Sequence, residues 1–287
     1  MGLMDKEKTQ GTRGRAWKAF RGNKAACVGL ACLALILIGC VFAPWLTPHS
    51  PYDQDLPNGL SPPSGEHWFG TDSLGRDVFA RVLYGGRTTL LMSVSALVIT
   101  VAAGGALGVA AGYCGGRVDM AVMCVVDVLA AIPAILLAIA VVAKTGIGAR
   151  NSMLAIALAG IPAFVRLLRA MIMEAVGSPY IGAARALGAG HFRVIFQQIL
   201  PNILAPVLVH GVTGIADAIL AFSSLGYLRI AVQPPQPEWG NMVVAGMSNF
   251  FSSWFILVYP CGAVVLTILS LRLVGNGLRD ALDPSLR

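Results

Sequence analysis

Residue types that could do chemistry are few in this sequence, and none forms a catalytic pattern. No GxxxxGKS/T segment is present, so we expect no phosphate-binding loop for ATP. Neither HExxH, which binds zinc, nor GxSxG, which presents a nucleophilic serine, occurs. The histidines His49, His67, His191 and His210 lack the spacing of metal ligands. We therefore expect no catalytic residue, no metal site and no cofactor bound by this chain.

Two carboxylates and one imidazole lie inside long apolar stretches, namely Asp127, Asp217 and His210. A charged side chain at the centre of a bilayer costs roughly 2.5–3.5 kcal/mol on insertion scales. Each carboxylate should therefore face the interior of a helix bundle, a partner subunit or a basic group. One interpretation is that all three residues line a translocation path. The alternative is that they make hydrogen bonds or packing contacts between helices.

The composition excludes a soluble enzyme and a disordered chain. Hydrophobic residues make up 56% of the 287 residues and charged residues only 12%, whereas average soluble domains carry roughly 25% charged residues. The mean hydropathy is +0.72. The six cysteines include no CxxC pair, and most lie in apolar runs, where they act as small packing residues.

Charge-poor runs predict six membrane-spanning helices, since a span needs about 20 mostly apolar residues. The fold class is therefore an all-α membrane protein with six transmembrane helices. The expected spans are Ala25–Leu46, Thr88–Gly112, Met120–Ala143, Gly146–Leu168, Asn202–Leu225 and Ser252–Val274.

The distribution of Lys and Arg predicts that both termini are cytoplasmic. With that orientation, 15 of the 21 basic residues fall inside and six outside, as the positive-inside rule requires. The net charge of +7 is thus spread over loops and does not indicate nucleic-acid binding. The expected organisation is a basic cytoplasmic arm over 1–24, a first transmembrane helix over 25–46, an external loop over 47–87, a five-helix core over 88–276 and a cytoplasmic tail over 277–287.

The external loop ends in a segment with helical periodicity. Apolar residues from Val78 to Leu83 share one helical face, while Asp77 and Arg81 have the i,i+4 spacing of an ion pair on another face. This pattern predicts a short interfacial helix that lies outside the membrane before the second span.

A cytoplasmic bend over 174–201 separates the fourth and fifth spans. Ser178-Pro179 has the signature of a helix start, and Gly188 that of a helix end. One face of this helix is formed by Tyr180, Ala183, Ala184 and Leu187. The small residues on the helix predict a shallow surface. A second short amphipathic helix over 192–199 should brace it. The alternative is an ordinary connecting loop with an interfacial helix.

Four ordered motifs resemble permeases of dipeptide, oligopeptide and nickel ABC importers, specifically the second permease of the pair. The bend resembles their EAA loop. The motifs are Ala183-Ala184-Arg185-Ala186-Leu187-Gly188 followed by Ile199-Leu200-Pro201, then His67-Trp68-Phe69-Gly70-Thr71-Asp72-Ser73-Leu74-Gly75-Arg76-Asp77, Gln233-Pro234-Pro235-Gln236-Pro237-Glu238-Trp239-Gly240-Asn241-Met242 and Gly277-Leu278-Arg279-Asp280-Ala281-Leu282-Asp283-Pro284. Three positions depart from the family pattern: Gly182 replaces the usual Glu, Arg229 a usual Gly and Asn276 a common Asp.

The resemblance implies a type I importer permease with a cytoplasmic coupling helix, placed in a bacterial inner membrane. It implies three kinds of protein partner, namely a second homologous permease, two ATP-binding subunits that use ATP and Mg, and an external substrate-binding protein. It also implies contact with membrane lipid. Implied contact residues for the ATPase are Tyr180, Gly182, Ala183, Ala184, Arg185, Leu187 and Gly188. Implied docking residues for the binding protein are Asp72, Arg76, Asp77, Glu238 and Trp239.

The expected cargo is short peptides, with nickel or a metal chelate as the alternative. A stand-alone secondary transporter is disfavoured because such a carrier needs no cytoplasmic docking helix, and because two isolated carboxylates make a sparse ion relay. An intramembrane enzyme is disfavoured because no nucleophile–base or metal pair is present.

Overall fold

The computed structural model describes residues 17–282, and the helices account for most of that range. Expectations for residues 1–16 of the basic arm and for residues 283–287 of the tail lie outside the described residues. The helices are α2 (Lys24–Val41), α3 (Ala43–Leu46), η1 (Leu56–Asn58), α4 (Val78–Cys114), α5 (Gly116–Ala130), α6 (Ala134–Thr145), α7 (Ala149–Val176), α8 (Pro179–Ala186), α9 (His191–Arg193), η2 (Val194–Ile199), α10 (Leu200–Tyr227), α11 (Trp239–Met247) and α12 (Phe255–Leu282). Within the described part, pairing of extended backbone is limited to one isolated bridge between Thr71 and Asp77.

Five helical segments are long and apolar enough to cross a membrane, and a bent pair brings the number to six if it counts as one span. This confirms the predicted all-α membrane fold. The five are α2, α4, α7, the continuous run His191–Tyr227 and α12, and the bent pair is α5 with α6.

The predicted third span, Met120–Ala143, corresponds to the bent pair α5 and α6 and not to one continuous helix. Helices α5 and α6 meet at an angle of 87° across the break between them. Pro133 lies at this break and precedes the first residue of α6. Because proline has no backbone N–H and disfavours a helical conformation at the residue before it, the chain bends there.

The predicted interfacial helix is also wrong, because Val78–Leu83 form the first turns of α4. Asp77 is the N-cap of this 37-residue helix, and its side chain accepts a hydrogen bond from the backbone N–H of Ala80. At 1.5 Å per residue α4 is about 55 Å long, well beyond a hydrocarbon core of roughly 30 Å. The same apolar face therefore continues from the outer region into the membrane.

Helix α4 crosses α7 closely because three glycines recur at every fourth position of α4. The absence of side chains lets large residues of α7 approach the α4 backbone, as in small-residue helix contacts of membrane proteins. The glycines are Gly104, Gly108 and Gly112, which lie against Phe164, Leu168 and Ile172.

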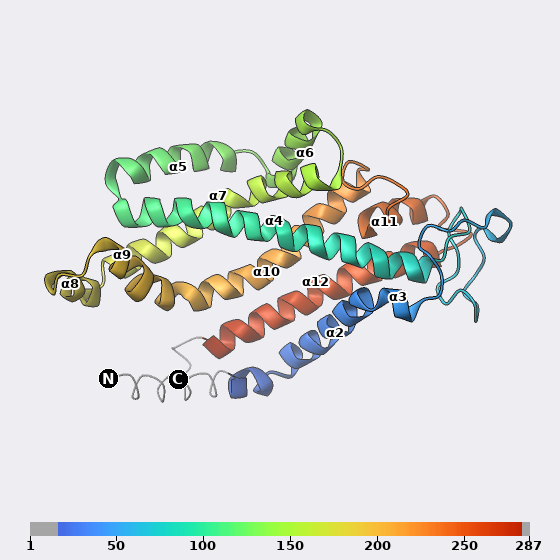
Figure 1. Cartoon of the computed structure of the whole chain (residues 1–287), viewed down its shortest axis with the longest axis horizontal. Coiled ribbons are helices and arrows are strands. Elements are labelled where there is room, and N and C mark those ends of the chain that lie inside the picture. Colours follow the sequence, from blue (N-terminus) through green and yellow to red (C-terminus); the bar gives the residue numbers. More distant parts are fainter. Residues whose placement is uncertain (1–16, 283–287) are drawn as a thin grey trace.

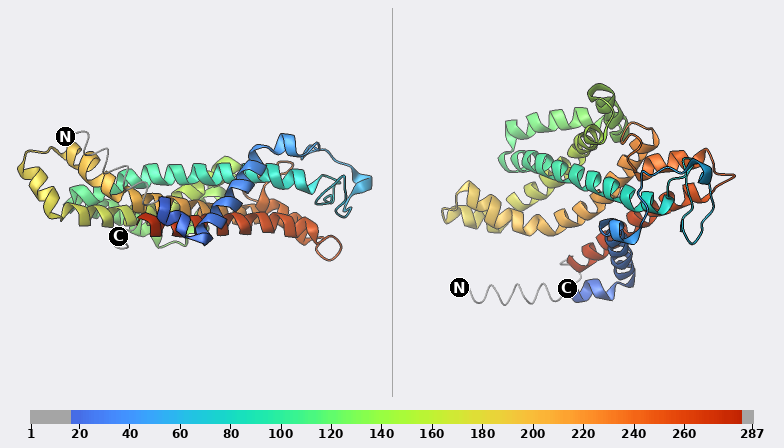
Figure 2. Two further views of the ribbon diagram at one scale, coloured as in Figure 1. Left: turned by 90° about the horizontal axis from the view of Figure 1, so that it is seen from below. Right: turned by 45° about the vertical axis from the view of Figure 1, so that its right-hand side comes forward.

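Helix α12 packs between α2 and α10, and the bundle is elongated (Figure 1). All three views place α8 at one end of the bundle and the loop over residues 47–77 at the other (Figure 2). The fold thus separates the predicted coupling helix from the predicted docking segments by the length of the membrane spans.

Candidate functional site: a cytoplasmic elbow, an intramembrane cavity and a locked outer loop

The elbow helix α8 begins and ends where the sequence predicts. Ser178 is its N-cap with extended backbone, and Pro179 occupies the first helical turn. Gly188 has φ +83°, a left-handed conformation that side chains rarely adopt. Ile181 is the buried residue of this helix. It packs in a cluster with residues of α7 and of the segment that follows the elbow, such as Ile172 and Ile199.

The opposite side of α8 is open within the described chain. Tyr180, Gly182, Ala183 and Arg185 are exposed, and a Cβ added at Gly182 would meet nothing within 4 Å. Leu187, which directly follows α8, is 90% exposed.

Polar contacts attach the elbow to two membrane helices. The guanidinium of Arg185 lies 5.4 Å from the ring centroid of Tyr113, near the end of α4. The hydroxyl of Tyr113 is 2.8 Å from Nδ1 of His191. Asn202, at the start of α10, donates its Nδ2 to the Tyr180 hydroxyl at 3.2 Å. A displacement of α8 would therefore also displace the contacting parts of α4 and α10.

The predicted second short helix is not separate from the fifth span. His191–Tyr227 is one continuous helical run, and its part over Val194–Ile199 is a π-helix. The wider π turns immediately precede Pro201, where a proline would break a regular α-helix. Phe192 and Phe196 are exposed on this run, with ring centroids 4.4 Å apart. The predicted brace is thus continuous with α10.

Both intramembrane carboxylates pair with an arginine of a neighbouring helix. Asp127 on α5 lies 2.6 Å from Arg166 on α7, and Asp217 on α10 lies 2.6 Å from Arg272 on α12. The two aspartate side chains remain 58% and 60% exposed. Because exposed charges are costly in lipid, water or a protein partner must surround these pairs in the membrane.

An open cavity of about 520 Å³ lies between α4, α6, α7 and α10. His210 and Asp217 both line it, seven residues apart on α10, together with Thr100, Phe164 and Leu220. Asp127 is not part of this lining. The structure therefore brings two of the three candidate path residues to one cavity and places the third elsewhere.

The outer loop closes around a buried network of charged side chains. Asp72 accepts a hydrogen bond from Nε of Arg76 at 2.8 Å, and its second oxygen accepts from two backbone N–H groups of the same turn. Arg81 lies 3.5 Å from Asp72 and donates to the carbonyl of Pro51 at 2.9 Å. Asp77 pairs with His67 at 2.8 Å and not with Arg81 as the i,i+4 spacing predicts.

The sequence of the core and N-terminal helix matches two family models. The model described as "Binding-protein-dependent transport system inner membrane component" matches residues 104–287. The model described as "N-terminal TM domain of oligopeptide transport permease C" matches residues 12–63. The chain belongs to the binding-protein-dependent permease family.

Relatives and a solved structure agree with this membership. The chain is 40% identical over 277 residues to "Di/tripeptide transport system permease protein DppC" of Pseudomonas aeruginosa (strain UCBPP-PA14), covering 94% of this chain and 91% of the relative. It is 41% identical to "Dipeptide transport system permease protein DppC" of Escherichia coli (strain K12), covering 94% and 92%. It is 40% identical to "Glutathione transport system permease protein GsiD" of Pectobacterium atrosepticum, covering 94% and 90%. An inward-facing structure of the MetNI methionine ABC transporter has the same fold, with TM-score 0.58, 16% identity and coverage of 70% of this chain and 96% of that one.

In this permease the second outer segment is locked by Glu238 and Trp239. Glu238 is fully buried and caps α11, because its carboxylate accepts from the backbone N–H groups of Gly240 at 2.7 Å and Asn241 at 2.8 Å. Burial raises the pKa of Glu238 to about 7, against the opposing effect of these hydrogen bonds and of one from Thr89. The Trp239 indole donates to the carbonyl of Val82 on α4 at 2.9 Å.

All five residues predicted to dock the binding protein are buried, which does not fit an exposed contact surface made of these side chains. The buried residues are Asp72, Arg76, Asp77, Glu238 and Trp239. Their hydrogen bonds cap α4 and α11 and tie both outer segments to α4. These side chains therefore hold the outer surface in shape from inside the fold.

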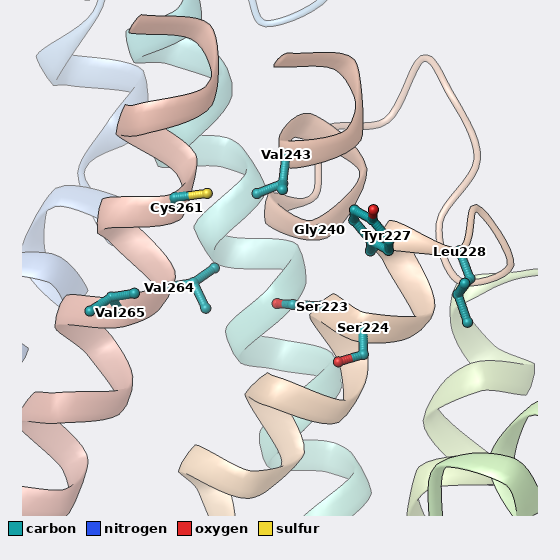
Figure 3. Close-up of a pocket in the computed structure, with 9 residues that line it drawn as sticks. All are labelled: Ser223, Ser224, Tyr227, Leu228, Gly240, Val243, Cys261, Val264 and Val265. Atoms are coloured by element: carbon teal, nitrogen blue, oxygen red, sulfur yellow. The ribbon is translucent and has the colours of Figure 1, made fainter. Parts of the chain in front are cut away.

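A second cavity of the permease, of about 360 Å³, lies between α10, α11 and α12 (Figure 3). Val243 comes from α11, Cys261 and Val264 come from α12, and Ser223 comes from α10. The Ser223 hydroxyl is buried and has no hydrogen-bond partner in the described structure. No carboxylate, Lys, Arg or His lines this cavity, so it offers no charge for a polar cargo.

Sequence reasoning missed the partners of the carboxylates. The sequence alone does not assign a carboxylate to Arg166 or Arg272, and it does not predict the Asp119–Arg169 pair, which has one contact of 2.6 Å between α5 and α7. The pairs join positions 39 to 55 residues apart. The feature of the sequence that could have indicated these ion pairs is the presence of opposite charges near the ends of the predicted spans.

Proposed function

We propose that this chain is the second of two homologous permease subunits in an ATP-driven importer of short peptides. The carrying observation is the elbow helix α8, which is anchored by a buried isoleucine, exposes small residues and lies at one end of the bundle. The three relatives described above are named for the transport of dipeptides, di/tripeptides and glutathione, which supports a peptide cargo.

Two ATP-binding subunits would supply the energy in this proposal. They would hold ATP and Mg, since this chain contains no GxxxxGKS/T segment. One of them would close onto the exposed side of α8, where Gly182 and Ala183 leave room for a tight contact. The contacts of Tyr180 with Asn202 and of Arg185 with Tyr113 would pass that movement to α10 and α4. Nucleotide binding would thereby bias two arrangements of the bundle, as alternating access requires.

The cavity with His210 and Asp217 is our candidate for this subunit's half of the path. The half-exposed Asp217–Arg272 pair fits an environment of water or a second permease better than one of lipid. Asp217, which lines this cavity, would attract the amino group of a peptide, and Arg272 would hold Asp217 in place through their ion pair. The competing role is a purely structural pair that holds α10 to α12.

The remaining partners follow from the same proposal. An external binding protein would deliver cargo at the end of the bundle formed by residues 47–77 and α11. Both termini would lie in the cytoplasm, as the distribution of basic residues predicts. Lipid would surround the peripheral helix α2, whose Leu35 and Val41 are exposed.

The proposal is tested by uptake in liposomes that contain the chain, its second permease, the ATPases and the binding protein. Replacing Ala183 with Phe should reduce uptake of a labelled dipeptide because overpacking a close contact costs about 1–3 kcal/mol, or roughly 5–150-fold. The matched variant Ala183→Ser keeps the side chain small and should transport normally. Ile181, which anchors the fold of α8, is untouched by both changes.

Three outcomes would contradict the proposal: full uptake with Ala183→Phe, uptake by the chain alone, or ATP hydrolysis by the chain alone. The cargo is tested separately, by measuring what the binding protein retains from a mixture of short peptides and nickel chelates. Retention of peptides supports the cargo proposed here, and retention of nickel alone replaces it with the alternative.

A further inference from the structure

Two histidines and an aspartate that are distant in sequence meet at the outer end of the permease. His49 follows α3, His67 lies in the external loop and Asp77 caps α4. One potential ligand atom from each residue lies within 4.8 Å of the other two. Among the described residues, this is the one group of three His, Cys, Asp or Glu side chains whose potential ligand atoms lie so close together.

The contacts within this cluster orient its side chains. Nδ1 of His67 lies 2.8 Å from Oδ2 of Asp77, and the side chain of Asp77 is only 3% exposed. The rings of His49 and His67 have centroids 4.7 Å apart. Nε2 of His49 lies 3.1 Å from the carbonyl oxygen of Glu66. A histidine that donates one ring N–H to a carbonyl presents its other nitrogen as a metal ligand.

We propose that His49, His67 and Asp77 form a binding site for a divalent transition-metal cation of the zinc class. Two imidazoles and one carboxylate suit zinc, nickel or copper, whereas calcium and magnesium prefer oxygen ligands throughout. Three protein ligands leave a fourth tetrahedral position for water. The proposal goes beyond the importer function and does not depend on it.

The ligand atoms of His49, His67 and Asp77 need to move only a short distance to bind a zinc ion. Zinc bonds of about 2.0–2.2 Å in tetrahedral geometry separate ligand atoms by roughly 3.3–3.5 Å. The His67–Asp77 contact of 2.8 Å is already close to that separation. The widest pair, at up to 4.8 Å, must shorten by a little over 1 Å, which rotation of the half-buried His49 ring can supply.

The surroundings of the cluster show how a cation can enter and which segments it would join. A cavity of about 440 Å³ opens beside the cluster and is lined by His49, Glu66, Trp68, Asp77 and Phe79, so an ion can enter from outside. Once bound, the cation would join the segment after α3 to the cap of α4. It would thus hold the outer loop in place by a cross-link that the hydrogen bonds alone do not provide.

The test uses the full chain without a polyhistidine tag, purified in detergent micelles, with zinc chloride as the probe. Isothermal titration should show one zinc ion bound per chain, and zinc should raise the temperature of thermal unfolding. His49→Ala should weaken binding by about 10-fold or more, because loss of even a residue that only orients a metal ligand typically costs about 10–100-fold in affinity. His191→Gln, at the opposite end of the bundle, is the matched histidine control and should bind zinc as the wild type does.

His67→Gln is the second variant, because glutamine can still donate a hydrogen bond to Asp77. It should unfold near the wild-type temperature without zinc but lose most of the zinc affinity. Cobalt provides a spectroscopic check, since its visible absorption bands should appear with the wild type and vanish with His49→Ala. The proposal is overturned if no zinc binds, if His49→Ala binds as tightly as the wild type, or if magnesium binds as well as zinc.

Discussion

At the scale of single residues, the fold changes the pH range over which the Glu238 carboxyl group titrates. It is fully buried, and its pKa is raised from 4.5 to about 7. Between these two values the folded chain keeps a proton that the unfolded chain releases. Unfolding therefore becomes more favourable as pH rises from about 4.5 to about 7, and the contribution levels off above that range.

We predict that the thermal stability contributed by Glu238 falls between about pH 4.5 and about pH 7. The measurement is the unfolding temperature in detergent at several pH values, for the wild type and for Glu238→Gln, which is neutral throughout. Subtracting one curve from the other cancels the contribution that the other titrating groups make to the pH dependence of the unfolding temperature. Wild-type stability should decline relative to the variant as pH rises, and parallel curves would contradict the raised pKa.

The carboxylates of the spans show how far residue-level prediction reaches. Intramembrane Asp127 and Asp217 were predicted to need a basic group, because an unpaired charge is too costly in a bilayer. Which arginine pairs with each depends on how α5 meets α7 and α10 meets α12, and one sequence does not contain that information. The burial of Asp72 and Asp77 was missed for a related reason: charged residues in a loop rich in Pro and Gly indicate exposure unless their partners are known.

At the scale of secondary-structure elements, the close crossing of α4 and α7 depends on glycines of α4. A Cβ at Gly112 would lie 2.9 Å from the carbonyl oxygen of Arg169 and 2.9 Å from Cβ of Ile172. At Gly105, seven residues earlier on the same helix, the nearest atom would be 3.8 Å distant. The two positions therefore form a matched pair on one helix.

We predict that Gly112→Ala destabilises the permease by about 1–3 kcal/mol, the usual cost of overpacking. Gly105→Ala should be neutral or slightly stabilising, since alanine favours a helix over glycine by up to about 1 kcal/mol. Thermal unfolding of both variants in detergent measures the difference. Equal unfolding temperatures would mean that α4 and α7 do not cross as closely as described.

A second pair of glycines tests the elbow. Gly188 has φ +83°, where an L-residue costs roughly 1–2 kcal/mol, whereas Gly182 is helical and open to added atoms. We predict that Gly188→Ala loosens the end of α8 and that Gly182→Ala tightens the helix. Hydrogen–deuterium exchange over residues 179–188 should speed up in the first variant and slow down in the second. The reverse order would rule out the helix end described here.

Element boundaries divide into those that sequence reasoning can locate and those that it cannot. Charge-poor runs located the five long apolar helices and the bent pair, because hydropathy is a local property. The break before Pro133 was missed because prolines also occur within spans, as Pro162, Pro206 and Pro260 do here inside α7, α10 and α12. Whether a proline kinks or breaks a helix depends on which neighbouring helices hold the two halves.

At the scale of the whole molecule, the isolated chain exposes apolar and charged surfaces that an assembled importer would surround differently. Leu220 on α10 lines the cavity that contains Asp217 and is 54% exposed. Leu35 on the peripheral helix α2 is 69% exposed and lines none of the cavities described above. In the proposed assembly the first would face a water-filled path and the second would face lipid.

Cysteine labelling separates these two environments. The native cysteines Cys27, Cys32, Cys40, Cys114, Cys124 and Cys261 are first replaced with alanine or serine. Leu220→Cys in the assembled importer should then react with a membrane-impermeant maleimide, because thiolates form only in contact with water. Its rate should differ between nucleotide-free and ATP-bound complexes, since alternating access changes the side from which the path opens. Leu35→Cys should stay unreactive in both states, and its labelling at the rate of Leu220→Cys would place the path elsewhere and remove the cavity from the transport mechanism.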